Sequence, residues 1–139
     1  MDLRERITID TGPITLLFAE DVPGKVSSLF ARVAKGEYHA RVVPPVMAEA
    51  YKHICVLRGN QIAQASMAKI FSDYPITLVD MTPSLTFKAG SLKCRYRDAL
   101  SYTDCFVIAH ALLDNAELHT TEKDLPDIPS LKLRKYAFD

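Results

Sequence analysis

The sequence predicts a single α/β domain, a three-layer arrangement with a mostly parallel central sheet and helices on both of its faces. Short strand-like runs alternate along the chain with longer segments of helical periodicity. Strands that are separated by helices run in the same direction within one sheet. A length of 139 residues with 48% hydrophobic content suits one domain, spanning 1–139, with a proper core and no linker or repeat.

Five short runs predict the strands. The first, "RITID", is rich in β-branched residues and ends at Asp10, where "TGP" interrupts it. The second, "HARVV", is closed by Pro44 and Pro45, because proline cannot donate to a ladder of backbone hydrogen bonds. In chain order, the expected strands are 6–10, 39–43, 75–80, 116–120 and 131–136.

The segments between these runs predict the helices. Pro13 suits the first turn of the first helix, and Gly36 and Gly59 end the second and the third. Two later segments carry apolar residues on one helical face, the clearest being Leu85 with Leu92. In chain order, the expected helices are 14–20, 23–35, 45–58, 61–73, 83–97, 102–114 and a short turn of helix between the last two strands.

The helix expected over 102–114 raises a question about Asp104. Residues 105–113 are almost continuously apolar, broken only by His110, so this helix should be buried on most sides. Ser101 and Asp104 fit a capping box, in which hydroxyl and carboxylate satisfy backbone N–H groups of the first turn. Capping alone explains Asp104 unless other acids converge on the same place.

Composition excludes several classes of protein. Seventeen basic residues balance 17 acidic ones, so net charge neither favours nor excludes a nucleic-acid partner. The three cysteines are odd in number and lack CxxC spacing, which argues against a disulfide framework or a zinc site. The N-terminus is charged and no apolar run approaches membrane-spanning length, so we expect a cytoplasmic protein without a membrane anchor.

Several acids follow the carboxyl ends of the expected strands, the edge at which parallel α/β sheets bind ligands. Asp10 closes the first strand, and Glu49 lies one turn into the helix after the second. Asp104 opens the helix that leads into the fourth strand. Glu122 and Asp124 follow that strand. We therefore expect these carboxylates to lie on one edge, without histidine or cysteine in a recurring pattern.

Each acid also has a local explanation. Asp10 can cap the first helix, Thr121 with Asp124 forms a second possible capping box, and Glu49 can be an exposed side chain near a helix start. We expect Asp80, before "MTP", to be a cap only. Whether these acids lie close together decides between local capping and metal binding, because carboxylates crowded on one edge repel and need a cation. A carboxylate-rich site without histidine suits hard ions such as Mg²⁺ and Mn²⁺.

Four stretches resemble the blocks of the PIN domain family. They are "ITIDTGPITLLF", "PPVMAEAY", "LSYTDCFVIAHAL" and "LHTTEKDL", and they occur in the family's order over the whole chain. No single block is specific to the family, but the four blocks together, in the family's order, are. The chain is most similar to the compact VapC-type toxins of that family.

This resemblance implies a ligand set and supporting hydroxyl groups. The implied Mg²⁺ or Mn²⁺ ligands are Asp10, Glu49 and Asp104, with a fourth acid from Glu122 or Asp124. The fourth block departs from the family, which more often has Asp or Asn where this chain has Glu122, so the choice stays open. The residues that match the family's hydroxyl positions, and would orient the carboxylates, are Thr11 and Thr120.

The implied activity is metal-dependent hydrolysis of phosphodiester bonds in single-stranded RNA by a toxin with a cognate antitoxin. The resemblance also implies a homodimer, to which the helix over 83–97 is a plausible contributor. That helix and its end carry four cations without an intervening acid, which either contact RNA or form a solvated surface: Lys88, Lys93, Arg95 and Arg97.

Two other classes are weighed against this interpretation. A response-regulator receiver shares the parallel α/β plan, but it needs an acid pair after its first strand, and "ITIDTG" supplies one acid. A non-catalytic PIN domain that binds RNA or protein is the second alternative. The acids present in all four blocks argue against it, and a metal-dependence assay separates the two.

Overall fold

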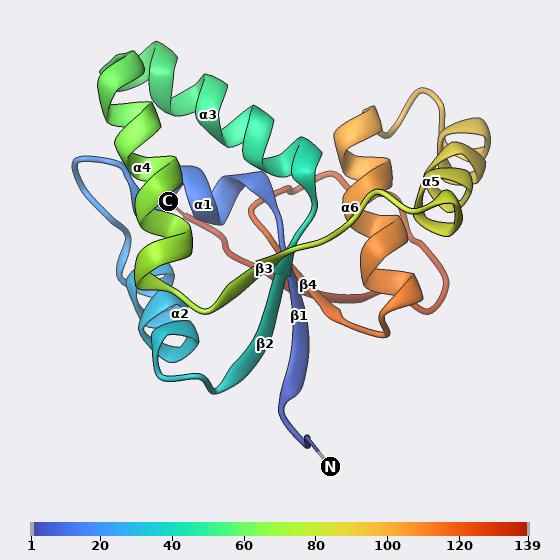
Figure 1. Cartoon of the computed structure of the whole chain (residues 1–139). Helices are drawn as coiled ribbons and strands as arrows, with labels where there is room; N and C mark the ends of the chain where they lie inside the picture. Colours follow the sequence, from blue (N-terminus) through green and yellow to red (C-terminus); the bar gives the residue numbers. More distant parts are fainter. Residues whose placement is uncertain (1, 139) are drawn as a thin grey trace.

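The computed structural model describes residues 2–138, which form one five-stranded, fully parallel sheet (Figure 1). The strand order is β3-β2-β1-β4-β5, so the chain builds outward from β1 in one direction and then returns to its other side. This reversal between β1 and β4 is a topological switch point, where open α/β sheets form a crevice. The strands are β1 (Glu5–Ile9), β2 (Tyr38–Val42), β3 (Ile76–Leu78), β4 (Glu117–Thr120) and β5 (Lys132–Lys135).

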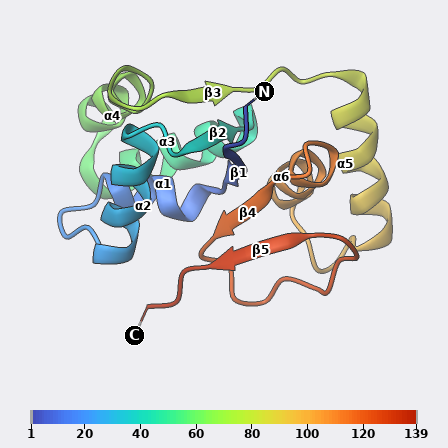
Figure 2. The ribbon, with the colours of Figure 1, turned by 90° about the horizontal axis from the view of Figure 1, so that it is seen from below.

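Helices cover both faces of the sheet and give the predicted three layers. Four helices lie on one face and two on the other, which the view in Figure 2 separates to the left and right of the strands. The first group is α1 (Thr11–Leu17), α2 (Gly24–Ala34), α3 (Pro44–Arg58) and α4 (Asn60–Asp73). The second group is α5 (Pro83–Arg95) and α6 (Tyr102–Leu113). The predicted fold class is therefore confirmed.

The core lies between the sheet and these helices. Ile7 and Ile9 of the central strand β1 are fully buried, as expected for a parallel strand that is covered on both faces. Of the twelve residues of α6, six are buried and four are partly buried, which confirms the prediction for this helix. The one polar interruption of the stretch 105–113, His110, is satisfied by a 2.8 Å hydrogen bond between its Nδ1 and Thr8 Oγ1. No helix within residues 2–138 is long and apolar enough to cross a membrane.

The prediction of a turn of helix after the fourth strand is wrong. Residues 121–131 form an irregular segment, so the capping box proposed for Thr121 and Asp124 has no helix to cap. Pro126 and Pro129 explain the difference, because proline lacks an N–H and keeps the residue before it out of the helical region. The segment is anchored by the buried side chain of Ile128 instead.

The bounds of α1 and the capping residue of α5 also differ from the prediction. α1 begins at Thr11 with Asp10 as its N-cap, and it ends at Leu17 rather than at 20. The assignment of Asp80 as a cap is wrong, because Thr82 caps α5 by accepting a 3.2 Å hydrogen bond from Leu85 N. Asp80 is exposed in the segment that connects β3 to α5.

Candidate metal centre

Asp10 is the most deeply placed acid at the carboxyl edge of the sheet. It follows β1, and only 6% of its surface is exposed. Thr11 N donates to its Oδ1 at 2.8 Å, and Thr120 Oγ1 donates to its Oδ2 at 2.7 Å. Burial, helped by the negative charges of Asp104 and Glu122, outweighs these two hydrogen bonds and raises the pKa of Asp10 to about 6.

Thr120 connects Asp10 to the segment after β4. Its hydroxyl oxygen donates to Asp10 and also accepts a 3.0 Å hydrogen bond from Glu122 N. The next residue, Thr121, lies against the first turn of α1, where a Cβ on Gly12 would stand 1.9 Å from its Oγ1. Glycine is therefore needed at position 12 for this close approach. Together these contacts fix the start of the segment that carries the fourth acid.

Asp104 forms the predicted capping box at the start of α6. Ser101 N donates to Asp104 Oδ2 at 3.0 Å, and Asp104 N donates to Ser101 Oγ at 3.1 Å. The local explanation for this residue is thus confirmed. It does not exclude a second role, because no hydrogen bond within the described chain occupies the other carboxylate oxygen of Asp104, and its charge acts on both Asp10 and Glu122.

Glu122 brings the remaining acids into the same neighbourhood. Its pKa is raised by partial burial and then by the charges of Asp104, Glu49 and Asp124. The pKa of Asp10 is raised by Asp104 and Glu122, so Asp10 belongs with these residues to one carboxylate cluster on four different elements or segments. No ion pair joins any of the five acids to a lysine or arginine within residues 2–138.

The donor chemistry of this carboxylate cluster fits a hard divalent cation. It offers carboxylate oxygens without histidine or cysteine, and its negative charge is uncompensated. Beside it, the hydroxyl oxygen of Thr11 is buried without a hydrogen-bond partner. In the described part of the chain, however, no three acidic, histidine or cysteine side chains stand close enough to hold one ion. Side chains of the cluster must therefore rotate inward to bind a metal.

Comparison with known proteins decides the family. The PIN domain profile matches residues 7–131, nearly the whole chain. This chain belongs to the PIN domain family. No curated protein sequence matched it at a significant level.

Solved structures show the same fold in VapBC complexes. VapBC2 from Rickettsia felis, bound to a DNA fragment from its promoter, gives a TM-score of 0.77 at 19% identity over 94% of this chain and 98% of that chain. DNA-bound VapBC from Salmonella typhimurium gives 0.73 at 12% identity over 94% and 98% of the two chains. VapC20 from Mycobacterium tuberculosis, a toxin that cleaves the sarcin-ricin loop, gives 0.66 at 18% over 81% and 86%. At these identities the likeness shows the fold.

Two of the basic residues near α5 of this PIN domain make contacts within the fold. Lys93 Nζ donates to the carbonyl oxygens of Arg97 and Leu100, at 3.0 and 2.7 Å, and so closes the C-terminal end of α5. The guanidinium carbon of Arg95 lies 5.6 Å from the ring centre of Tyr96. Contact of Lys88, Lys93, Arg95 and Arg97 with RNA remains a prediction.

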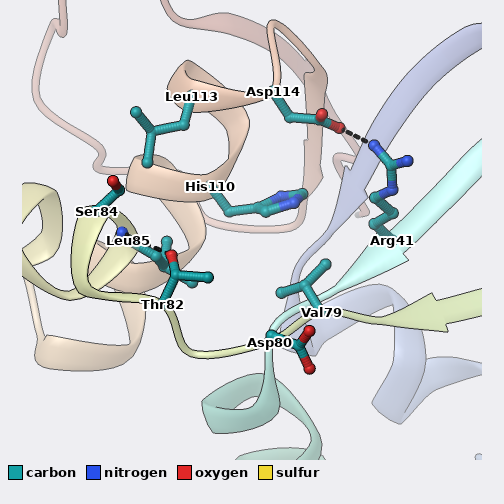
Figure 3. Close-up of a pocket in the computed structure, with 9 residues that line it drawn as sticks. All are labelled: Arg41, Val79, Asp80, Thr82, Ser84, Leu85, His110, Leu113 and Asp114. Atoms are coloured by element: carbon teal, nitrogen blue, oxygen red, sulfur yellow. Dashed lines mark hydrogen bonds and ion pairs between the residues drawn. The ribbon is translucent and has the colours of Figure 1, made fainter.

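A second polar group of the PIN domain was not predicted from the sequence. It lines a pocket of about 460 Å³ between β2, the start of α5 and the end of α6 (Figure 3). Asp114 points toward Arg41 there, with 2.6 Å between Oδ2 and Nη1, and it also pairs with Arg6. His110 lines the same pocket, and burial lowers its pKa. None of the five clustered acids lines this pocket, so it is separate from the carboxylate cluster.

Proposed function

We propose that this protein is a Mg²⁺- or Mn²⁺-dependent endoribonuclease that hydrolyses phosphodiester bonds of single-stranded RNA in the cytoplasm, as the toxin of a toxin–antitoxin pair. The observation that carries this proposal is the convergence of five acids at the switch point of a PIN domain without a compensating cation. The structural likeness to VapC20, a toxin that cleaves the sarcin-ricin loop, supports RNA as the substrate.

Three acids would hold the cation, namely Asp10, Glu49 and Asp104, and either Glu122 or Asp124 would complete the set. When bound, Mg²⁺ or Mn²⁺ lowers the pKa of a water molecule and neutralises charge on the scissile phosphate. A cation would also offset the repulsion between carboxylates, which adds to burial in raising the pKa values of Asp10 and Glu122.

The surrounding hydrogen bonds would orient the carboxylates. Thr120 and the backbone of Thr11 hold the two oxygens of Asp10 in a fixed plane, and Ser101 holds one oxygen of Asp104. Outer contacts of this kind restrict the rotation of a ligand and lower the entropy cost of binding. The hydrogen bond from Glu122 N to Thr120 Oγ1 would keep the segment that carries the fourth acid near Asp10.

We also propose an antitoxin partner and a homodimer. The chains with similar folds come from VapBC complexes, which supports an antitoxin. Large apolar side chains are exposed on α3 and α5, the most exposed being Val56, Leu57 and Phe87, and such surfaces commonly mark contacts with protein. Light scattering that shows only a 15.5 kDa monomer at micromolar concentration would contradict the homodimer.

One observation favours a non-catalytic PIN domain as the second candidate. Asp104 already serves as a capping residue, and no three ligands stand together in the described chain as it is. Such a protein would bind RNA or another protein without cleaving it. Its RNA affinity would be the same with and without divalent metal.

The test is cleavage of an unstructured RNA and of an RNA hairpin with Mg²⁺, with Mn²⁺ and with EDTA. We expect metal-dependent products from the wild type and none from Glu49→Gln, purified in parallel as the control for a contaminating nuclease. Cleavage that persists in EDTA, or equal cleavage by the two proteins, would contradict the proposed function, as would intact RNA at every metal concentration.

A further inference from the structure

Within residues 2–138, a groove between α2 and the end of β5 is lined by four cations and by no acid. Its volume is about 580 Å³. The chain as a whole has equal numbers of acidic and basic residues, so this enrichment is local. The residues that line it, called here the basic groove, are Gly24, Lys25, Ser28, Leu29, Arg32, Tyr38, Arg134, Lys135 and Tyr136.

The four charged side chains of the basic groove are exposed, and its two lysines make no ion pair within residues 2–138. Lys25 Nζ donates to the carbonyl oxygen of Ala137 at 3.3 Å, and no carboxylate within residues 2–138 pairs with its charge. Lys135 makes no ion pair within residues 2–138.

The two arginines of the groove have acidic neighbours outside its lining. Arg134 Nε is 3.4 Å from Glu117 Oε1, a long separation for an ion pair. Arg32 pairs with Glu37 at 2.7 Å and lies 4.6 Å from the ring centre of Tyr38. Neither acid lines the groove, so the charged side chains that line it in the described part of the chain are all cationic.

The floor of the basic groove is rigid and aromatic. Tyr38 and Tyr136 are 3% and 8% exposed, and the ring of His119 lies 5.9 and 5.7 Å from theirs. The hydroxyl of Tyr136 is 2.7 Å from His119 Nδ1. Because these rings are buried, they hold the backbone of the groove in place and offer no free face on which a base could stack.

The groove reaches the edge of the sheet that carries the carboxylate cluster. Tyr136 N donates to the carbonyl oxygen of Thr120 at 2.9 Å, and the hydroxyl of Thr120 donates to Asp10. Asp10 follows β1 and Tyr136 follows β5, which are two places apart in the sheet, or roughly 10 Å at the usual strand spacing. The N-terminal end of α2, whose first turn contains no acid, lies at this end of the groove.

We propose that the basic groove binds the sugar–phosphate backbone of RNA that flanks the bond to be cleaved. Lysine and arginine without free aromatic faces or amide side chains recognise phosphate and carry no base specificity. The groove therefore supplies length-dependent affinity, while the carboxylate cluster supplies chemistry. This inference rests on the proposed function for its substrate, but its binding step is measurable without cleavage.

The test is RNA affinity in EDTA, measured by fluorescence anisotropy on Glu49→Gln so that no cleavage occurs. Adding Lys25→Gln and Lys135→Gln should weaken binding of a labelled single-stranded RNA about tenfold and reduce the slope of log affinity against log salt by about 1.4, since each lost phosphate contact contributes about 0.7. The matched control carries Lys35→Gln and Lys69→Gln, the same loss of charge at exposed residues that do not line the groove.

Cleavage kinetics give the second measurement. With the catalytic acids intact, the groove variant should show a raised KM on a long RNA and an unchanged kcat, and it should match the wild type on a dinucleotide, which is too short to reach the groove. If the groove pair destabilises the fold, Arg134→Gln with Lys135→Gln replaces it.

Each outcome separates the groove from the proposed function. Affinity and salt slope equal to those of the control pair, in a wild type that cleaves RNA, would overturn the groove inference and leave the nuclease intact. A wild type that never cleaves, but whose RNA binding falls in the groove variant, would overturn the nuclease and retain the groove. Failure of the Glu49→Gln parent to bind RNA would overturn the groove inference.

Discussion

The two sides of the carboxylate cluster are built differently. Asp10 is buried at the end of the central strand, and both of its oxygens accept hydrogen bonds. Glu122 and Asp124 are exposed in the irregular segment 121–131. One hydrogen bond, from Glu122 N to the hydroxyl oxygen of Thr120, positions the backbone of Glu122. The first side is fixed before any ligand arrives, whereas the second can adjust. We infer that Asp10 determines where a cation binds and that the segment after β4 closes around it.

The largest expected effect comes from removing the fixed acid. Asp10→Asn should lower metal-dependent RNA cleavage by more than about 100-fold, because even residues that only support a metal ligand cost 10–100-fold. Glu49→Gln and Asp104→Asn should behave alike. Initial rates at saturating Mn²⁺ provide the measurement, and near-full activity of Asp10→Asn would remove the fixed side from the site.

The second effect is a pH dependence of stability in chelator. The pKa of Asp10 rises from 3.8 to about 6 on folding, so its ionised form destabilises the fold by up to about 3 kcal/mol above pH 6, and this cost disappears as pH falls to about 4. Asp10→Asn should therefore be more stable than the wild type at pH 7, and the difference should vanish near pH 4.

The difference in the free energy of unfolding between the wild type and Asp10→Asn is measured by urea unfolding in EDTA, at about five pH values from 4 to 8. The comparison needs both proteins, because burial lowers the pKa of His119 to about 4. That histidine removes stability from each of them as pH falls from about 6.5. A constant difference across the whole range would mean that the charge on Asp10 is not strained.

The third effect concerns the link between the two sides. Thr120→Val removes the donor to Asp10 and the acceptor for Glu122 N together, and should lower kcat by about 10–100-fold with the fold retained. Thr120→Ser keeps the hydroxyl and should restore most of the activity. Equal rates for the valine and serine variants would show that the link is dispensable.

The smallest effect is expected at the adjustable side. Glu122→Gln and Asp124→Asn should each lower cleavage less than Asp10→Asn does, and the larger of the two losses identifies the fourth ligand. A loss at either position as large as that of Asp10→Asn would contradict the distinction between a fixed and an adjustable side. Equal small losses would mean that three acids suffice.

The ends of the elements next to Asp10 and Asp104 could be predicted approximately from the sequence, because their signals are local. A β-branched run before Asp10, a helix capped by Ser101 with Asp104 three residues on, and proline after the second strand each indicate an element boundary. The order of parallel strands then places the carboxyl ends together. No tertiary information was needed for these elements.

The remaining features depend on contacts between distant parts of the chain. Pro126 and Pro129 prevent a helix after β4, although the acids there resemble a capping pattern. The need for Gly12 arises from Thr121, more than one hundred positions away in the chain, and the basic groove combines α2 with β5. Local patterns contain none of these pairings, so only the folded structure reveals them.

The central claim is that Asp104 acts in one metal site with the other acids as well as capping α6. Thermal melts of the wild type and of Asp104→Asn, in EDTA and in Mn²⁺, test it most directly. Asparagine is also a good capping residue, so relief of repulsion should make the variant melt higher in EDTA. Mn²⁺ should raise the melting temperature of the wild type by mass action and that of the variant far less. Equal melting temperatures in EDTA together with equal responses to Mn²⁺ would contradict the claim and leave Asp104 as a cap.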